Sequence, residues 1–124
     1  MAITGSAGKT SLKELLAQSL NQIMPTVFSK KSFNNKYGVP LSLFNINKVH
    51  KIGIFEIGMD KKGEIDNLSK LVRPDIGLIT NITYAHAKNF DSLKGIANAK
   101  AEIIDNIYSG GKIILNADDY FFNF

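Results

Sequence analysis

The amino-acid sequence predicts an α/β fold, with a mostly parallel sheet flanked by helices. Short apolar runs alternate along the chain with longer segments whose apolar residues recur at helical spacing. Polar clusters follow the apolar runs, and in a parallel sheet such clusters gather at the carboxyl edge of the strands. The length of 124 residues, with 44% hydrophobic and 21% charged residues, is typical of one globular domain.

The first predicted elements surround a glycine-rich turn. Residues 1–4 form the stub of a strand, and leucines at helical spacing predict a helix over residues 9–23. Pro25 ends this helix because it cannot continue the backbone hydrogen bonds. Residues 26–29 are a short strand candidate, and the polar stretch 29–38, rich in Lys and Asn, is predicted to be a loop.

The middle of the chain contains one ambiguous segment and one clear strand. Residues 39–46 fit a helix or a strand, whereas "KIGIFEI" at 51–57 predicts a strand. A loop at 58–63 leads to a helix over Glu64–Val72, which the Arg-Pro pair at 73–74 closes.

The last third repeats the alternation. The apolar run "IGLITNI" at 76–82 predicts a strand, and a polar loop covers 83–90. A helix is predicted over 93–107, and Gly110 and Gly111 end it. Lys112–Leu115 is the last strand, followed by "NADD".

Charge and composition limit the classes of function. The chain lacks cysteine, which excludes disulfides and thiolate sites and fits the cytoplasm. A net charge of +4 favours anionic ligands, but the lysines are scattered, so nucleic acid is not the expected partner. With no signal peptide or apolar run of membrane-spanning length, no membrane association is expected.

The stretch "ITGSAGKTS" at 3–11 has the composition of a phosphate-binding loop, with glycines for backbone approach, a lysine for the outer phosphates and a hydroxyl for Mg²⁺. Ile3 departs from the usual pattern, which has a glycine there. The alternative is a helix N-terminus with an exposed lysine. The residues expected to bind a nucleotide here are Gly5, Ser6, Ala7, Gly8, Lys9, Thr10 and Ser11.

Other candidates lie after the later strands. Glu56 ends an apolar strand and is a candidate Mg²⁺ ligand, held directly or through water, or else a carboxylate that is solvated or paired with a lysine. His86 is a candidate metal or phosphate ligand, although a lone loop histidine is more often merely exposed. Spacing alone favours a solvated surface role for Lys100. Asparagine and aspartate at strand ends and in the first long loop either line a site or form turns: Asn34, Asn35, Asn81, Asn116, Asp118 and Asp119.

Taken together, these pieces resemble the central ATP-binding domain of the Mur ligases. The matching stretches cover nearly the whole chain in the family's order: "ITGSAGKTS", "FNNKYGVPLSL", "FEIGMDKKGEIDNLSKLVRPDIGLITNI", "AHAKNFDSLKGIANAKAEI" and "ILNADD". Within the family, the sequence is most similar to members that add D-alanyl-D-alanine to the UDP-N-acetylmuramoyl tripeptide of peptidoglycan synthesis. Folylpolyglutamate synthase, the alternative, shares the loop and fold but resembles these stretches less.

The resemblance implies an ATP-dependent ligase that forms an acyl phosphate and then an amide. It assigns Lys9 to the outer phosphates, and Thr10, Glu56 and His86 to Mg²⁺. Lys100 matches a lysine that is often carbamylated in the family and then serves as a Mg²⁺ ligand. Catalytic roles would fall to Lys9, Lys100 and His86, while Asn81, Asn116 and Asp118 would contact the nucleotide.

The resemblance also implies that residues 1–124 are an incomplete central domain. The family has an amino-terminal domain for the UDP-sugar and a carboxy-terminal domain for the amine substrate, and neither matches here. We therefore expect a truncated, split or decayed ligase that is inactive alone; if it is split, it works only when another chain supplies the missing domains.

Overall fold

The computed structural model describes residues 1–84 and 89–123, and it shows one five-stranded sheet in the order β2-β3-β1-β4-β5. All paired strands are parallel. The elements, in chain order, are β1 (Ala2–Thr4), α1 (Lys9–Asn21), β2 (Thr26–Phe28), α2 (Gly38–Leu43), β3 (Ile52–Glu56), α3 (Glu64–Val72), β4 (Ile76–Ile79), α4 (Leu93–Ala101), the 3₁₀ helix η2 (Ile104–Asn106) and β5 (Lys112–Leu115). The predicted α/β fold with a parallel sheet is confirmed.

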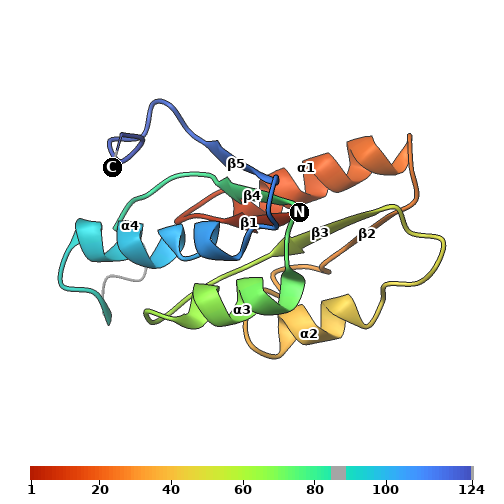
Figure 1. Cartoon of the computed structure of the whole chain (residues 1–124), viewed down its shortest axis with the longest axis horizontal. Coiled ribbons are helices and arrows are strands. Elements are labelled where there is room, and N and C mark those ends of the chain that lie inside the picture. Colours follow the sequence, from red (N-terminus) through yellow and green to blue (C-terminus); the bar gives the residue numbers. More distant parts are fainter. Residues whose placement is uncertain (85–88, 124) are drawn as a thin grey trace.

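Helices cover both faces of the sheet (Figure 1), with α1 on one side and α2, α3 and α4 on the other. Each face has its own apolar core. The smaller core lies under α1 and the larger one under the other three helices. The fully buried residues of the larger core include Ile57, Ile65, Ile96 and Ile103. Those of the core under α1 include Ile3, Ala17 and Ile54.

Strand β1 lies at the centre of the sheet and sets the position of the site. Ile3 pairs with Glu56 of β3 on one side and with Leu78 of β4 on the other. Because the three strands are parallel, the loops that follow them leave the same edge. The loop that follows β1 therefore lies beside the loops that follow β3 and β4.

Two predicted helices end earlier than their periodicity suggests. Helix α1 stops at Asn21, whose side-chain Oδ1 accepts a hydrogen bond from the Thr26 amide at 3.0 Å, and Ile23 is 74% exposed. The helix predicted over 93–107 ends at Ala101 and continues as η2. In η2 the side-chain amide of Asn106 donates to the backbone carbonyl of Glu102 at 3.2 Å. Bonds of this kind between a side chain and the backbone compete with the hydrogen bonds of a continuous helix.

The ambiguous segment at 39–46 is the short helix α2, and the predicted strand at 76–82 is shorter, since β4 ends at Ile79. In residues 1–84 and 89–123, no helix combines the length and apolar character needed to cross a bilayer.

Candidate functional site

The loop predicted to bind phosphate connects the central strand β1 to α1 and has two glycines with positive φ. Gly8, at φ 78°, precedes the first turn of α1, and Gly5 has φ 145°. A Cβ on Gly5 would lie 1.9 Å from the Thr80 hydroxyl oxygen, so no other residue fits there without a shift. This hydroxyl donates to the Ala7 carbonyl at 2.6 Å. Sequence reasoning missed the role of Thr80, whose only signal was its place at the end of a strand.

Asn81 holds the other side of the loop. Its carbonyl accepts the Ser6 amide and its side-chain Oδ1 accepts the Ala7 amide, both at 2.9 Å. The Ser6 hydroxyl donates to the Thr83 carbonyl and accepts from the Thr83 amide, again at 2.9 Å. The predicted proximity of Asn81 to the loop is therefore seen, through contacts that fix the loop's backbone.

Lys9 begins α1 and folds back over the loop. Its Nζ donates to the Gly5 carbonyl at 2.8 Å, and the side chain is half-buried. Burial lowers the pKa of Lys9, and the nearby carboxylate of Glu56 partly offsets this effect. The lysine thus lies where a phosphate group cradled by the loop would meet a positive charge.

Glu56 ends β3 as a buried carboxylate, only 1% exposed. One oxygen accepts the Thr10 hydroxyl at 2.8 Å, and the other accepts the Asn34 side-chain amide at 2.7 Å. The Ser29 hydroxyl accepts the Glu56 backbone amide at 3.0 Å. A water-exposed strand-end carboxylate, the alternative from sequence, is therefore wrong.

A hydroxyl and a carboxylate within hydrogen-bond distance are oxygen donors of the kind that Mg²⁺ takes in nucleotide sites. The pair of Thr10 and Glu56 fits such an ion in donor chemistry. Across residues 1–84 and 89–123, no three His, Asp or Glu side chains gather closely enough to hold a metal by themselves. Most ligands of an ion here would then come from phosphate and water, as is usual for Mg²⁺.

Lys100 on α4 is only 2% exposed, so the solvated lysine that spacing alone favours is wrong. Small neighbours on the helix, Ala97 and Ala99, are buried with it. Burial, with a smaller contribution from the positive charge of Lys9, lowers the pKa of Lys100 to about 8. The two lysines come from different helices and influence each other at the same edge of the sheet.

Most of the remaining asparagine and aspartate candidates form turns, and one of them holds a neighbouring loop. Asn35 accepts the amides of Tyr37 and Gly38 at the start of α2. Asn116 accepts the Asp118 amide at 3.1 Å in a turn after β5, and both residues are exposed.

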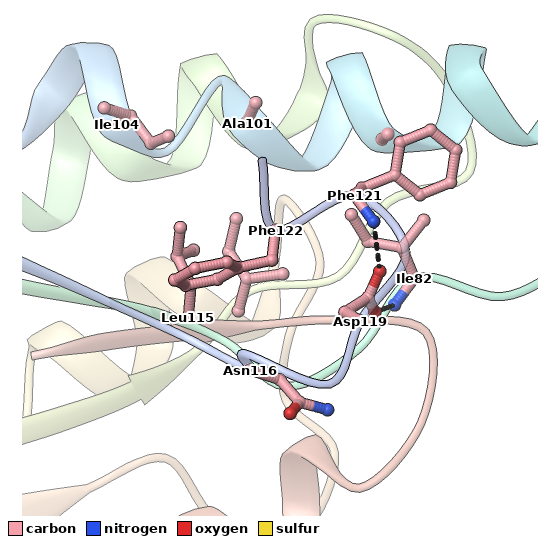
Figure 2. Close-up of a pocket in the computed structure, with 10 residues that line it drawn as sticks. Ile82, Ala101, Ile104, Leu115, Asn116, Asp119, Phe121 and Phe122 are labelled. Carbon is pink, nitrogen blue, oxygen red and sulfur yellow. Dashed lines mark hydrogen bonds between the residues drawn. The ribbon is translucent and has the colours of Figure 1, made fainter. Parts of the chain in front are cut away.

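Asp119, rather than Asp118, reaches the neighbouring loop. Its carboxylate accepts the Ile82 amide at 2.7 Å and the Phe121 amide at 3.0 Å (Figure 2). An apolar pocket of about 100 Å³ lies beside it, below α4, and Phe122 is among the residues that line it. Asn116 points away from the apolar side chains (Figure 2).

Ser11 is exposed on α1, and His86 lies outside the described residues.

A larger cavity of about 590 Å³ opens between the phosphate loop, the 34–37 segment and the start of α3. Its lining is mixed, with cationic, amide and acidic groups: Lys9, Asn34, Lys36, Asp60, Glu64 and Asn67. Lys9 therefore lines this cavity as well as contacting the Gly5 carbonyl of the loop.

Comparison with known proteins agrees with this geometry. A model of the Mur ligase middle domain matches residues 3–124. The UDP-N-acetylmuramoyl-tripeptide--D-alanyl-D-alanine ligase of Buchnera aphidicola (strain APS) is 42% identical over 123 residues, which are 99% of this chain and 27% of that protein. The Escherichia coli protein of the same name is 39% identical over 119 residues, covering 96% of this chain and 26% of its own length.

Solved structures give the same result. A crystal structure of MurF from Acinetobacter baumannii superposes with a TM-score of 0.94 at 40% identity, covering 97% of this chain and 26% of that one. A MurF ligase from Thermotoga maritima in complex with ADP gives a TM-score of 0.88 at 31% identity, covering 94% and 27% of the two chains. The chain thus spans about a quarter of the length of these relatives. With the family model matched from Ile3 onward, the chain belongs to the Mur ligase family, as its middle domain.

Proposed function

We propose that this chain supplies the ATP- and Mg²⁺-binding part of an amide-forming ligase of peptidoglycan precursor synthesis. The observation that carries the proposal is the meeting, at one edge of the sheet, of Lys9 in the phosphate loop with the Thr10–Glu56 pair. The relatives named for D-alanyl-D-alanine addition support the finer assignment, as does the ADP complex of one structural neighbour. A cytoplasmic location, where ATP and UDP-linked precursors are available, is part of the proposal.

Each site residue has a role in the proposed reaction. The loop amides and Lys9 bind and orient the phosphates of ATP. Thr10 and Glu56 hold Mg²⁺, which when bound neutralises phosphate charge during transfer. We further propose that Lys100 joins this ion site in carbamylated form and that His86 contributes to it, as the family resemblance implies. Asn81 keeps the loop in shape through the Ser6 and Ala7 amides.

The chemistry proposed for the parent ligase proceeds in two steps. The γ-phosphoryl group of ATP passes to the terminal carboxylate of the UDP-N-acetylmuramoyl peptide, which gives an acyl phosphate and ADP. The amine of D-alanyl-D-alanine then attacks the acyl carbon, and the resulting tetrahedral adduct expels phosphate as the amide forms. Positive charge from Lys9 stabilises the transferring phosphoryl group, and positioning supplies most of the remaining acceleration.

Calorimetric titration with ATP tests the nucleotide part of this proposal. We expect ATP to bind in the presence of Mg²⁺, more weakly without it, and not measurably to Lys9→Ala. Lys48→Ala is the matched control, because this lysine lies at an exposed position after α2 and should leave binding unchanged. A folded chain that binds no ATP with Mg²⁺ present would refute the proposal.

We also propose that ligation needs segments beyond residues 1–124 for the UDP-sugar and for D-alanyl-D-alanine, supplied on the same polypeptide or on another. Residues 1–124 alone should then form no amide product from ATP, D-alanyl-D-alanine and the UDP-muramoyl tripeptide. Product formation by this chain alone, detected by mass spectrometry, would contradict this expectation.

A decayed remnant without a stable fold is the competing hypothesis. Exposed aromatic residues in the last segment, such as Tyr120 at 90% exposure, favour it because uncovered apolar surface promotes association. Cooperative thermal unfolding at low micromolar concentration would reject the remnant hypothesis, and aggregation without a transition would support it.

A further inference from the structure

We propose that Lys13 is a positioning residue that fixes the loop between β2 and α2 against the Mg²⁺ side of the site. Lys13 lies on α1, one helical turn after Lys9, and its side chain is completely buried. No element of the proposed mechanism uses it. A lysine that is fully buried requires specific polar partners, because an unpaired amino group would be strongly unfavourable there.

The partners of Lys13 tie two segments together. Its Nζ donates to the backbone carbonyl of Lys31 and lies 2.9 Å from the Glu14 carboxylate. Glu14 is its neighbour on the same helix, whereas Lys31 belongs to the loop that follows β2. The lysine therefore anchors this loop to the helix that carries the phosphate loop.

The loop needs an anchor at this point. Lys31 has φ 49°, a left-handed conformation that is unfavourable for a residue with a side chain and that persists only where other contacts determine it. The bond from Lys13 is made to the carbonyl of this same residue. The chain thus turns sharply at Lys31 and enters the segment that reaches the site.

The residues that follow the turn contact the proposed Mg²⁺ ligands. The Ser32 hydroxyl lies 3.4 Å from the Thr10 hydroxyl, and the Asn34 amide donates to Glu56 at 2.7 Å. The Asn34 carbonyl accepts the Gly58 amide at 2.7 Å, just after β3. Losing the anchor at Lys31 should therefore move Asn34 away from both Glu56 and Gly58, while the rest of β3 stays paired with β1.

Amide hydrogen exchange on this chain tests the inference directly. In Lys13→Met, the Gly58 amide should exchange roughly tenfold or more faster than in the wild type, because its acceptor lies in the released loop. The Ile57 amide donates to Ile3 of β1 at 2.8 Å, and its exchange should stay within about twofold. Lys30→Met is the matched control, since Lys30 is an exposed lysine of the same loop.

Lys13→Gln provides a second variant in case the methionine variant does not fold. Its side chain is one bond shorter than that of lysine and carries no charge, so its bond to the Lys31 carbonyl should be weaker and the same local loss is expected, while a polar group stays beside Glu14. Unchanged Gly58 exchange in either folded variant overturns the proposal. Equal acceleration at Gly58 and Ile57, or failure of both variants to fold, also overturns it, because Lys13 would then stabilise the domain as a whole.

A second readout rests on the proposed function. Lys13→Met should weaken ATP binding in the presence of Mg²⁺ by roughly tenfold and leave Mg²⁺-free binding within about twofold. Equal losses with and without Mg²⁺ would contradict a role on the ion side of the site. If the wild type binds no ATP, the proposed function fails, and hydrogen exchange still decides the role of Lys13.

Discussion

Replacing Gly5 with alanine should be among the most damaging single changes in the phosphate loop. Gly5 has φ 145°, which residues with a side chain rarely adopt. Its added methyl group would lie 1.9 Å from the Thr80 hydroxyl oxygen and 3.0 Å from the Thr80 backbone nitrogen. Because β1 and β4 pair directly beneath this contact, neither strand can move away without losing sheet hydrogen bonds.

Two effects add in this substitution. Forcing a non-glycine residue into such a conformation costs about 1–3 kcal/mol. Overpacking against a fixed backbone costs about 1–3 kcal/mol more. We therefore expect the free energy of unfolding to fall by about 2–6 kcal/mol, a large part of the roughly 5–15 kcal/mol that holds a domain together.

Urea unfolding monitored by circular dichroism measures this loss. Gly63→Ala is the matched control: Gly63 has φ 87°, but a Cβ there meets nothing within 4 Å, so only the backbone cost of about 1–2 kcal/mol applies. Thr80→Ala should recover part of the loss in the Gly5→Ala background, because it removes the nearest atom. A Gly5→Ala variant as stable as Gly63→Ala would refute the steric part of the reasoning.

Three further predictions concern charged residues of the site and the carboxylate that caps α3. Glu56→Gln should fold but lose the Mg²⁺-dependent part of ATP affinity in calorimetry, and unchanged Mg²⁺ dependence would exclude Glu56 as an ion ligand. Burial holds the pKa of Lys100 near 8 in the folded chain, against an ordinary value of 10.5. Between pH 8 and 10.5 the unfolded chain therefore binds more protons than the folded chain. The free energy of unfolding should then rise by about 3 kcal/mol across this pH range. Lys100→Met should reduce that rise in urea titrations run at several pH values, leaving the part that comes from the lowered pKa of Lys9. A wild type whose stability does not rise would contradict the burial argument. Glu102→Ala should lower the free energy of unfolding by about 1–2 kcal/mol, because the Glu102 carboxylate caps α3 by accepting the amides of Gly63 and Asp66. An unchanged melting temperature would show that solvent replaces this cap.

The parts of the site that depend on local sequence could be predicted. The loop from Gly5 to Thr10, for which phosphate binding is proposed, is encoded in a few consecutive residues, and its position after an apolar strand fixes its place in the sheet. The same rule placed Glu56, because the end of a neighbouring parallel strand must reach the same edge.

Burial of lysine could not be predicted in the same way. Leucines at helical spacing predicted α1, yet one of them, Leu15, is 62% exposed while Lys13 is fully buried. The reason is tertiary: the loop that covers Lys13 comes from residues after β2, and nothing in α1 itself records it. Lys100 is likewise buried, although the spacing of residues on its own helix favours a solvated position.

The support from Asp119 shows a similar limit. The "NADD" stretch signals polar chemistry at the end of a strand, but does not say which carboxylate turns inward. That choice follows from the position of the Ile82 amide, which lies 37 residues away in sequence on the loop after β4. Asp118, one residue earlier, stays exposed.

The burial of charge at this edge links stability to the proposed binding of phosphate. Lys9 and Lys100 approach each other in a poorly solvated region, and this lowers the pKa of Lys100. Glu56 offsets part of the charge at Lys9, but its two oxygens are already engaged by Thr10 and Asn34. The free chain therefore carries positive charge that is unfavourable in its folded state.

As long as Lys100 is not carbamylated, an anion bound near Lys9 and Lys100 would reverse this balance, since both amines would then favour their charged forms. Lys100 should thus lower the stability of the free chain and raise the affinity of the chain for phosphate, a trade-off that is common at functional sites. Lys100→Met should accordingly be more stable than the wild type below pH 8 and yet bind ATP with Mg²⁺ more weakly. A variant that gained stability without losing affinity would show that the charge of Lys100 serves neither the fold nor the nucleotide.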